Sequence, residues 1–287
     1  MESSLFITDD ICEKINNETV AEISPCGKYA RMNEIVGQGS SKIVYKALNI
    51  KMMTEVAYNM MDISYIKKEE KIRIYNEIQI LKKINHPNII NIIDVWYNKE
   101  KKQVVFTVPL FSYNLKKFIE KYYLHISTEN KIKWIKQLIN GILHLHLQDI
   151  IHRDLKLANL FIDTNTGNIC IGDFGLSKKF NSEIKTNSCI GTPEYMAPEL
   201  YSGEYDKSVD IYALGMCILS MFTNEDPYSE CNNIMQIYKK VINKIPPKAL
   251  DKIENIKIKN IILKLTGDKE IRPKIYDIKK YFEDVCS

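Results

Sequence analysis

Two patterns of hydrophobic and polar residues divide the chain near residue 110. Before it, β-branched and aromatic residues gather in short runs separated by Gly, Ser and Asn positions, as is typical of β-strands. These runs are residues 35–36, 43–47, 55–60, 89–96 and 104–108. Residues 67–84 differ, because Ile74, Ile78 and Leu81 fall on one face of a helix. The first part therefore predicts a small β-sheet with one helix.

After Leu110 the apolar residues recur every three or four positions, which predicts α-helices. The expected helices are residues 114–121, 128–147, 207–222, 235–241 and 257–264. The first 32 residues are polar and weakly patterned. We therefore expect an N-terminal extension (1–32), a small β-rich lobe (33–108) and a larger, mainly helical lobe (109–283). The two lobes together form one α+β domain over residues 33–283.

Composition limits the class of protein. Of the 287 residues, 45% are hydrophobic and 26% charged, which excludes disordered, collagen-like and coiled-coil chains. The net charge is only +4 and the basic residues are dispersed, so we expect no nucleic-acid partner. The longest uncharged, mostly apolar run, residues 211–224, is shorter than the roughly 20 residues that span a bilayer, so no membrane span is expected. Seven cysteines without a CxxC pair, and a start without a secretory signal, predict a cytoplasmic protein with reduced thiols.

Three short motifs follow a glycine-rich turn and carry the candidate chemistry. They read HRDLKLAN (152–159), DFG (173–175) and GTPEYMAPE (191–199). Each is weak alone, but their order and spacing are those of the protein-kinase signature set. The chain is therefore identified as a member of the protein kinases. This resemblance implies a two-lobed α+β kinase fold and transfer of the γ-phosphate of ATP to Ser or Thr hydroxyls of protein substrates.

Phosphoryl transfer requires positioning of the reactants and stabilisation of spread negative charge. Asp154 can accept the proton of the substrate hydroxyl, and Lys156 can neutralise the γ-phosphate. Asn159 and Asp173 offer the oxygen ligands that Mg²⁺ prefers. The motifs therefore predict ATP and Mg²⁺ as cofactors, a base, a catalytic lysine and two metal ligands.

One expected residue is absent from the third strand. Kinases carry V-A-I-K there, and the lysine pairs with a glutamate on the following helix. This chain reads V-A-Y-N over residues 56–59, whereas Glu77 fits the helix glutamate. Asn59 offers no positive charge to the phosphates. The glycine loop instead reads GQGSSKIV over residues 37–44, so that Lys42 replaces the third glycine of the usual pattern.

Strand geometry makes Lys42 the candidate replacement. Side chains alternate between the faces of a strand, so Lys42 and Val44 point the same way. The residue at the Val44 position covers the adenine in kinases, and Lys42 should therefore face the phosphates and reach Glu77. Lys46 lies on the same face further along the strand and is a second candidate. Without any replacement, the chain would be a weak or inactive pseudokinase that serves as a regulatory binding module.

Other nucleotide contacts are expected along the loop, the third strand and the connector to the second lobe. Ala57 shares the ligand-facing side of the third strand. Pro109 lacks an N–H, so Leu110 is expected to provide the backbone contact in the connector. Thr107 is expected to guard the deeper pocket. The predicted nucleotide-binding residues are Gly37, Gly39, Lys42, Val44, Ala57, Thr107 and Leu110.

With a lysine in the glycine loop and none on the third strand, the chain resembles the with-no-lysine (WNK) kinases. These kinases lack the third-strand lysine and place their catalytic lysine in the glycine loop. Further likeness lies in YDKSVDIYA (205–213) and PYSEC (227–231), and it extends over residues 33–282. A downstream kinase is therefore one candidate substrate. Phe174 stands where the family usually has Leu beside its chloride-sensing pocket, so chloride sensing is not carried over.

The resemblance also implies roles for residues outside the catalytic motifs. Ser188 matches the family's main autophosphorylation site, and a phosphate there adds about −1.5 to −2 charges. Its candidate basic partners are Arg153, Lys178, Lys179 and Lys185. Glu199 and Arg272 are expected to form a buried ion pair, and Asp210 to hold the backbone of the catalytic loop. His144 and His146 lie on different faces of a predicted helix and are not expected to share a metal.

Overall fold

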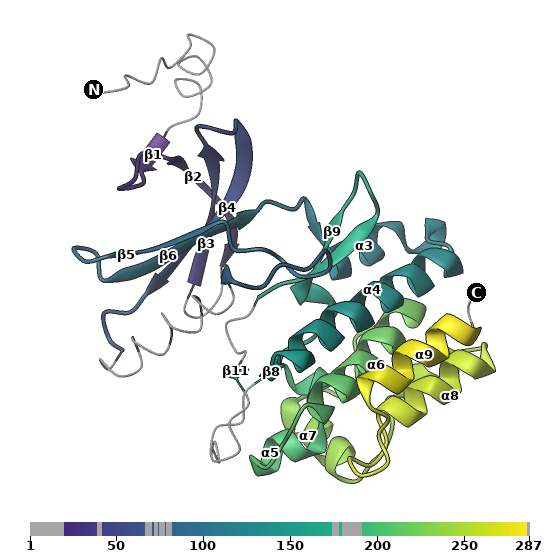
Figure 1. Cartoon of the computed structure of the whole chain (residues 1–287). Helices are drawn as coiled ribbons and strands as arrows, with labels where there is room; N and C mark the ends of the chain where they lie inside the picture. Colours follow the sequence, from purple (N-terminus) through teal and green to yellow (C-terminus); the bar gives the residue numbers. More distant parts are fainter. Residues whose placement is uncertain are drawn as a thin grey trace. The chain divides into compact units, whose positions relative to one another are not determined.

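A computed structural model of the chain describes residues 20–38, 42–66, 71, 74, 78, 82–173, 178–179 and 191–285 (Figure 1). The chain forms two compact units. The first consists of Met1–Ile84 and Asn91–Leu110, and the second of Asn85–Ile90 and Phe111–Ser287. The boundary after Leu110 coincides with the change from strand-like to helix-like sequence pattern.

The first unit is built on a six-stranded antiparallel sheet with the strand order β1-β2-β3-β4-β6-β5. The strands are β1 (Val20–Ile23), β2 (Tyr29–Gln38), β3 (Lys42–Asn49), β4 (Thr54–Asp62), β5 (Asp94–Asn98) and β6 (Gln103–Pro109). Residues 71, 74, 78 and 82 are helical, within the range predicted for a helix. β1 and the start of β2 lie in the segment for which the sequence pattern predicted no element.

Aromatic side chains fill one face of this sheet. Tyr29 stacks on Trp96 with ring centroids 5.8 Å apart, and Tyr58 meets the same indole edge-on at 5.4 Å. Ala47 and Val105 complete the buried cluster. Because side chains alternate along a strand, the residues between these positions lie on the opposite face. That opposite face carries Lys42, Val44 and Ala57, which are predicted to meet a nucleotide.

The second unit is mainly helical. Its helices are α3 (Leu115–Tyr122), α4 (Thr128–Leu147), α5 (Pro198–Ser202), α6 (Ser208–Thr223), α7 (Ile234–Ile242), α8 (Ile256–Leu265) and α9 (Ile275–Val285). Short 3₁₀ turns are η1 (Tyr123–His125), η2 (Leu157–Asn159), η4 (Pro193–Tyr195) and η5 (Lys248–Lys252). Five helices match the predicted ranges to within one residue at each end, whereas α5 and α9 were not predicted.

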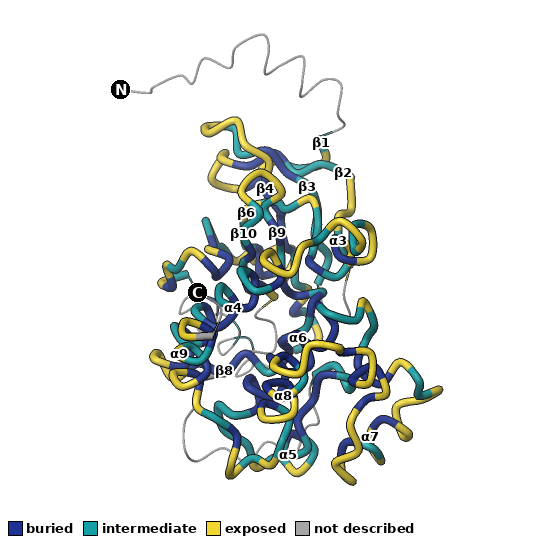
Figure 2. The backbone as a smooth tube through the Cα atoms, turned by 90° about the vertical axis from the view of Figure 1, so that its right-hand side faces the viewer, coloured by how far each residue is buried: buried dark blue, intermediate teal, exposed yellow. Residues whose placement is uncertain are grey.

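Local sequence explains where several of these helices begin. A polar side chain before the first turn accepts a backbone N–H that has no partner within the helix. This capping residue is Asn114 for α3, Ser127 for α4, Asn233 for α7 and Asn255 for α8. α6 is buried along most of its length, which explains its apolar sequence and places it at the centre of the second core (Figure 2).

Short strands complete the second unit. β7 (Tyr113–Asn114), β9 (Leu160–Asp163) and β10 (Asn168–Ile171) form one small sheet, and β8 (Ile150–Ile151) pairs with β11 (Lys178–Lys179). The segment at residues 85–90 joins β10, because Ile90 N donates to Ile171 O and Ile171 N to Asn88 O, both at 2.8 Å. The predicted strand over residues 89–96 is therefore wrong in its first half, since part of that segment hydrogen-bonds in the second unit.

A buried ion pair braces the second unit. Arg272 Nη1 lies 2.5 Å from Glu199 Oε1 and donates to the Ser208 carbonyl at 2.8 Å. Its Nη2 donates to the Gly267 carbonyl at 3.0 Å. The Arg272 side chain is almost completely buried, so these partners replace the water that it loses. The predicted pair of Glu199 and Arg272 is confirmed.

Candidate active site

Asp154 lies at the centre of a cluster of polar side chains that the segment between β8 and β9 brings together. Thr192 Oγ1 donates to Asp154 Oδ1 at 2.7 Å, and Asn159 Nδ2 donates to Asp154 Oδ2 at 2.9 Å. Lys156 Nζ lies 2.9 Å from Asp154 Oδ2 and 2.5 Å from Thr192 Oγ1. The Asp154 carboxylate is nearly buried, and both of its oxygens accept hydrogen bonds. The cluster thus joins two motifs that are distant in sequence.

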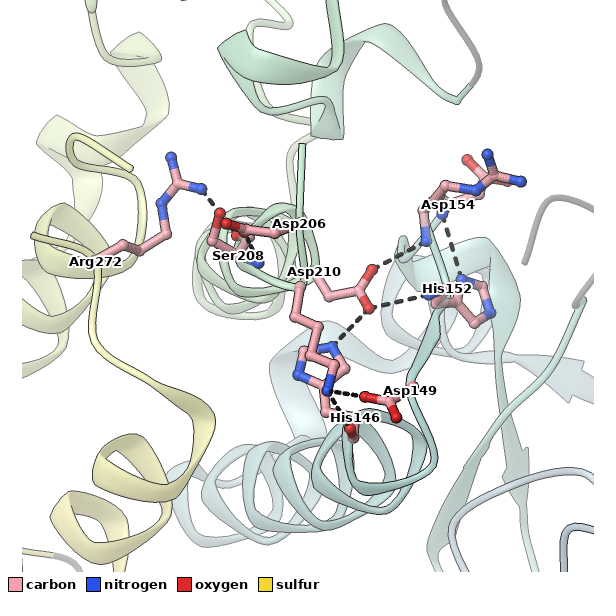
Figure 3. A network of polar contacts seen from close by, with 10 residues as sticks. His146, Asp149, His152, Asp154, Asp206, Ser208, Asp210 and Arg272 are labelled. Carbon is pink, nitrogen blue, oxygen red and sulfur yellow. Dashed lines mark hydrogen bonds and ion pairs between the residues drawn. The ribbon is translucent and has the colours of Figure 1, made fainter. Parts of the chain in front are cut away.

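Asp210 at the start of α6 holds the main chain of this segment (Figure 3). Its Oδ2 accepts the His152 N–H at 3.0 Å, and its Oδ1 accepts the Arg153 N–H at 2.9 Å. Arg153 has a φ of 68°, a left-handed conformation that is costly for a residue with a side chain. The two hydrogen bonds hold that conformation, and the predicted contact of Asp210 with the catalytic-loop backbone is confirmed.

His152 links the catalytic segment to the residue before Asp173. His152 Nε2 lies 3.0 Å from the Gly172 carbonyl, and its Nδ1 accepts the Asp154 N–H at 3.3 Å. Because a carbonyl only accepts, Nε2 is the donor of this ring. Gly172 N also donates to the Asn159 carbonyl at 2.9 Å. These bonds fix the start of the segment that carries Asp173, whose φ is 56°.

Two histidines of α4 have different surroundings, as their spacing predicted. His146 is buried, and its Nε2 lies 2.8 Å from Asp210 Oδ2. His144 Nε2 lies 2.8 Å from Gln148 Nε2, and its ring packs 4.8 Å from that of His86. Sequence reasoning missed the support that His146 gives to Asp210, because nothing in the local pattern links a helix face to a residue 64 positions away.

Several influences set the pKa of the Asp210 carboxyl. Burial is the largest of them and raises the pKa. The hydrogen bond and the charge of His146, together with His152, act in the opposite direction and hold the pKa below its ordinary value. The carboxylate form of Asp210 is therefore part of what stabilises the fold around the catalytic segment.

Replacing Asp210 by Asn is expected to lower the free energy of unfolding by roughly 3–5 kcal/mol at neutral pH, as when one partner of a buried pair is removed. Since the folded pKa of Asp210 is depressed, its contribution is complete above the unfolded pKa of about 3.9 and disappears as the pH falls through the folded pKa. The difference between wild type and Asp210→Asn should therefore shrink below about pH 4. Urea unfolding at stepwise lower pH measures this, and a constant difference would contradict a role for the charge.

The first unit arranges the other predicted residues on β3 and β4. Val44 pairs directly with Asn59, Lys42 with Met61 and Lys46 with Ala57. Lys42 therefore lies on the same face as Asn59 and diagonally next to it, within reach of a long side chain. Asn59 is buried and donates from Nδ2 to the Ala57 carbonyl at 3.2 Å.

Lys46, the second candidate, has a carboxylate partner of its own. Its Nζ lies 2.8 Å from Glu55 Oε1 and 4.0 Å from Glu34 Oε2. Ala57, which pairs with Lys46, is two residues from Asn59 in the direction away from the glycine loop. The register therefore places Lys46 away from Asn59, the position at which kinases usually carry the phosphate-binding lysine. The ammonium group of Lys46 is also engaged by Glu55.

Thr107 lies in β6, on the same face of the sheet as Tyr58. The register pairs Thr107 with Tyr58 and with Asp94, and its side chain is completely buried. Alternation along β6 turns Phe106 towards the face of Asn59 instead. That Thr107 guards the deeper pocket stays a prediction, and Phe106 is a residue on the face of Asn59 that sequence reasoning missed.

The structure describes only some of the remaining predicted residues. Gly37 pairs with Val44 across β2 and β3, and Leu110 ends the first unit. Six residues singled out in the sequence lie outside the described residues: Gly39, Glu77, Leu81, Phe174, Lys185 and Ser188. Among the described residues, no helix has the length and apolarity needed to cross a membrane.

The antiparallel sheet, the helical unit and the Asp154 cluster define a protein kinase domain. The family profile for the protein kinase domain matches residues 30–280, and the chain belongs to this family. The predicted two-lobed kinase fold is confirmed.

Within the family, the chain is similar to WNK kinases, as the lysine in its glycine loop predicted. It is 38% identical to "Serine/threonine-protein kinase WNK8" of Arabidopsis thaliana, over 91% of this chain and 47% of that protein. It is 39% identical to "Serine/threonine-protein kinase Wnk" of Drosophila melanogaster, over 91% of this chain and 11% of that protein. "Probable serine/threonine-protein kinase WNK6" of Oryza sativa subsp. japonica is 41% identical over 85% of this chain and 56% of its own length. The chain therefore spans about half the length of these plant relatives, and far less of the Drosophila one.

Proposed function

We propose that the chain is a serine/threonine protein kinase that transfers the γ-phosphate of ATP to a hydroxyl group of a protein substrate. The observation that carries this proposal is the cluster around Asp154. Thr192 already donates its hydroxyl hydrogen to Asp154 Oδ1 at 2.7 Å, which is the contact that a substrate hydroxyl needs with a general base. The similarity to kinases named as acting on serine and threonine agrees with this substrate class.

Asp154 and Lys156 have complementary roles in this proposal. Asp154 accepts the proton as the substrate oxygen attacks phosphorus, and the Asn159 amide holds the carboxylate in place. Lys156 Nζ lies beside both the carboxylate and the hydroxyl of Thr192, where negative charge develops during transfer. The site therefore supplies an acceptor for the proton and a positive charge for the phosphoryl oxygens.

Asn159 and Asp173 fit the chemistry of Mg²⁺. The Nδ2 atom of Asn159 donates to Asp154, so Oδ1 is the atom that it can offer to a cation. Among the described residues, no group of three His, Cys, Asp or Glu side chains is arranged to hold a metal. Mg²⁺ commonly binds one or two carboxylates and completes its shell with phosphate and water, and Asn159 and Asp173 offer oxygen atoms for such a shell. Bound Mg²⁺ would neutralise phosphate charge, while Asn159 and Asp173 would hold it.

We assign the contact with the ATP phosphates to Lys42. The register of β3 and β4 supports this assignment, because Lys42 lies diagonally next to Asn59, at which kinases usually carry the lysine. Glu77 is proposed to orient the ammonium group. Val44 and Ala57 lie on the same face of the sheet and are proposed to contact the adenine.

The proposal is tested by transfer of labelled γ-phosphate from ATP to a serine- and threonine-containing protein. Purified wild type with Mg²⁺ is expected to label the protein, and the chelator EDTA is expected to stop the labelling. Acid hydrolysis of the product should yield phosphoserine or phosphothreonine. If the wild type binds ATP but transfers no phosphate, even with Ser188 replaced by Asp, the alternative of a pseudokinase that acts by binding takes its place.

Ser188 is proposed to control activity through phosphorylation. Arg153 Nη1 donates to Tyr205 Oη at 2.9 Å, and β11 brings the backbone of Lys178 opposite Ile151, close to Arg153 in the chain. A phosphate of about −1.5 to −2 charges can order a segment by pairing with such basic residues. Ser188→Ala is therefore expected to lower the rate of transfer at least about tenfold. Thr186→Ala is the matched control, and equal rates for both variants would contradict the proposal.

A further inference from the structure

Helix α7 carries both buried and exposed residues along its short length (Figure 2). Ile237 and Val241 are buried, with 5% and 2% of their surface exposed. Four other apolar residues of the same helix are exposed: Ile234 (62%), Met235 (61%), Tyr238 (37%) and Ile242 (42%). Single exposed apolar residues are ordinary on a protein surface, but four on one short helix form a patch.

Helix geometry shows that these residues form one continuous stripe. At about 100° per residue, the apolar positions cover roughly 160° of the helix circumference. In order around the helix they are Ile237, Val241, Ile234, Tyr238, Ile242 and Met235. The protein core covers only the first two, about 40° of this arc. An amphipathic helix usually buries its whole apolar stripe, so the remainder is available to a partner.

The exposed stripe has a basic border. Lys239 follows Met235 around the helix by about 40° and is exposed. Among the described residues, Lys239 has no carboxylate partner. Glu230, which precedes α7 in the chain, pairs with Lys240 at 2.5 Å. We name the exposed residues Ile234, Met235, Tyr238, Lys239 and Ile242 the α7 surface.

The α7 surface is continuous with the elements that follow Thr192. α7 packs against η4, which begins at the residue after Thr192. The ring of Tyr238 meets the ring of Tyr201 in α5 edge-on, with centroids 5.0 Å apart. Asp154 and the α7 surface therefore belong to the same unit of the kinase, and a protein substrate that places a hydroxyl group at Asp154 would bind to that unit.

We propose that the α7 surface binds an acidic amphipathic segment of the protein substrate, which deepens the function proposed above and rests on it. Apolar side chains of that segment would cover the exposed stripe, and its carboxylates would pair with Lys239. A second copy of this chain fits less well, because a two-fold contact places two identical surfaces together, and the α7 surface offers a lysine but no carboxylate to pair with it. Charge complementarity therefore favours an acidic partner.

Binding can be measured without knowing the substrate, by fluorescence anisotropy with two synthetic helical peptides. Both carry Leu at i, i+4 and i+7, and the flanking positions are Glu in one peptide and Lys in the other. The acidic peptide is expected to bind at least about tenfold more tightly than the basic one. Met235→Asp and Lys239→Glu should each weaken that binding by a similar factor. Ile271→Asp is the matched control, because Ile271 is also exposed but lies outside α7.

A kinetic measurement connects binding to catalysis. An acceptor peptide fused through a flexible linker to the acidic helix should have a kcat/KM at least about tenfold above that of the acceptor alone. Met235→Asp should remove this gain and leave the acceptor alone unchanged. Equal binding of both helices, or binding that Met235→Asp does not alter, would overturn the proposal. So would light scattering that shows a dimer which Met235→Asp dissociates.

The two measurements separate the two proposals. If the acceptor peptide is not phosphorylated at all, the proposed kinase function fails, while the anisotropy result still decides whether the α7 surface recognises an acidic helix. If the acceptor is phosphorylated but the fusion brings no gain, the kinase function stands and the docking proposal fails.

Discussion

Lys42→Met is expected to lower the rate of phosphoryl transfer at least about 100-fold, as when one fixed donor to a transition-state charge is removed. Methionine keeps the length and apolar stem of the side chain but has no charge. The loss of transfer rate should therefore arise from the missing contact with the ATP phosphates and not from altered packing of β3. Single-turnover transfer of labelled phosphate measures the chemical step directly.

Lys46→Met is the matched control, since it removes a lysine from the same strand and face. Lys46 already pairs with Glu55 at 2.8 Å, so its replacement should change transfer by less than about threefold, within the range of a surface ion pair. If Lys42→Met stays active and Lys46→Met does not, the roles of the two lysines are reversed.

The strand register suggests a more demanding form of this test. Asn59 pairs with Val44 and lies diagonally next to Lys42, so a lysine at position 59 would project from the same face. In the Lys42→Met background, Asn59→Lys should restore transfer at least about tenfold, because it returns the charge to that face. Recovery would show that the position of the charge matters. A failure to recover in a folded protein would mean that the chain depends on Lys42 itself.

The helices were the part of the fold most open to prediction. The range expected for α4 from its apolar spacing is the one observed, and it begins after Ser127, a strong capping residue. The pattern at residues 89–96 misled because apolar periodicity shows that a segment is buried but not which sheet it joins. Residues 88–90 hydrogen-bond to β10, more than 80 positions away, and only the tertiary structure decides that pairing.

Two other features of the structure were not predicted from the sequence, and each has its own cause. β1 and β2 flank a turn at Pro25 and Gly27, and Gly27 has a φ of 68°. That turn signal was present in the sequence, but the polar residues around it concealed the strands. Phe106 was not singled out, because the face on which it lies depends on the register between β4 and β6. A shift by one residue reverses the face of every side chain, and the sequence does not specify that register.

The candidate site was predictable in its residues but not in its contacts. The HRDLKLAN motif contains Asp154, Lys156 and Asn159, so their proximity follows from the sequence. That Thr192 closes the cluster from 38 positions away does not. Likewise, the Asp210 contact was expected from resemblance, but the buried His146 beside it became evident only from the packing of α4 against α6.

Asp154→Asn is expected to lower the rate of phosphoryl transfer roughly a thousandfold, within the range for loss of a general base. Asparagine has nearly the same shape but cannot take the proton of the attacking hydroxyl. The loss should appear in single-turnover transfer at saturating ATP.

Asp163→Asn is the matched control for this prediction. Asp163 caps a turn after β9 by accepting from Asn165 N at 2.9 Å and Thr166 Oγ1 at 2.8 Å, outside the Asp154 cluster. It should therefore lose some stability but little activity. Asp154→Asn should show the opposite result, with thermal unfolding near that of wild type and ATP affinity maintained. Transfer within tenfold of wild type would mean that another group accepts the proton, and that the hydrogen bonds to Asp154 serve the fold alone.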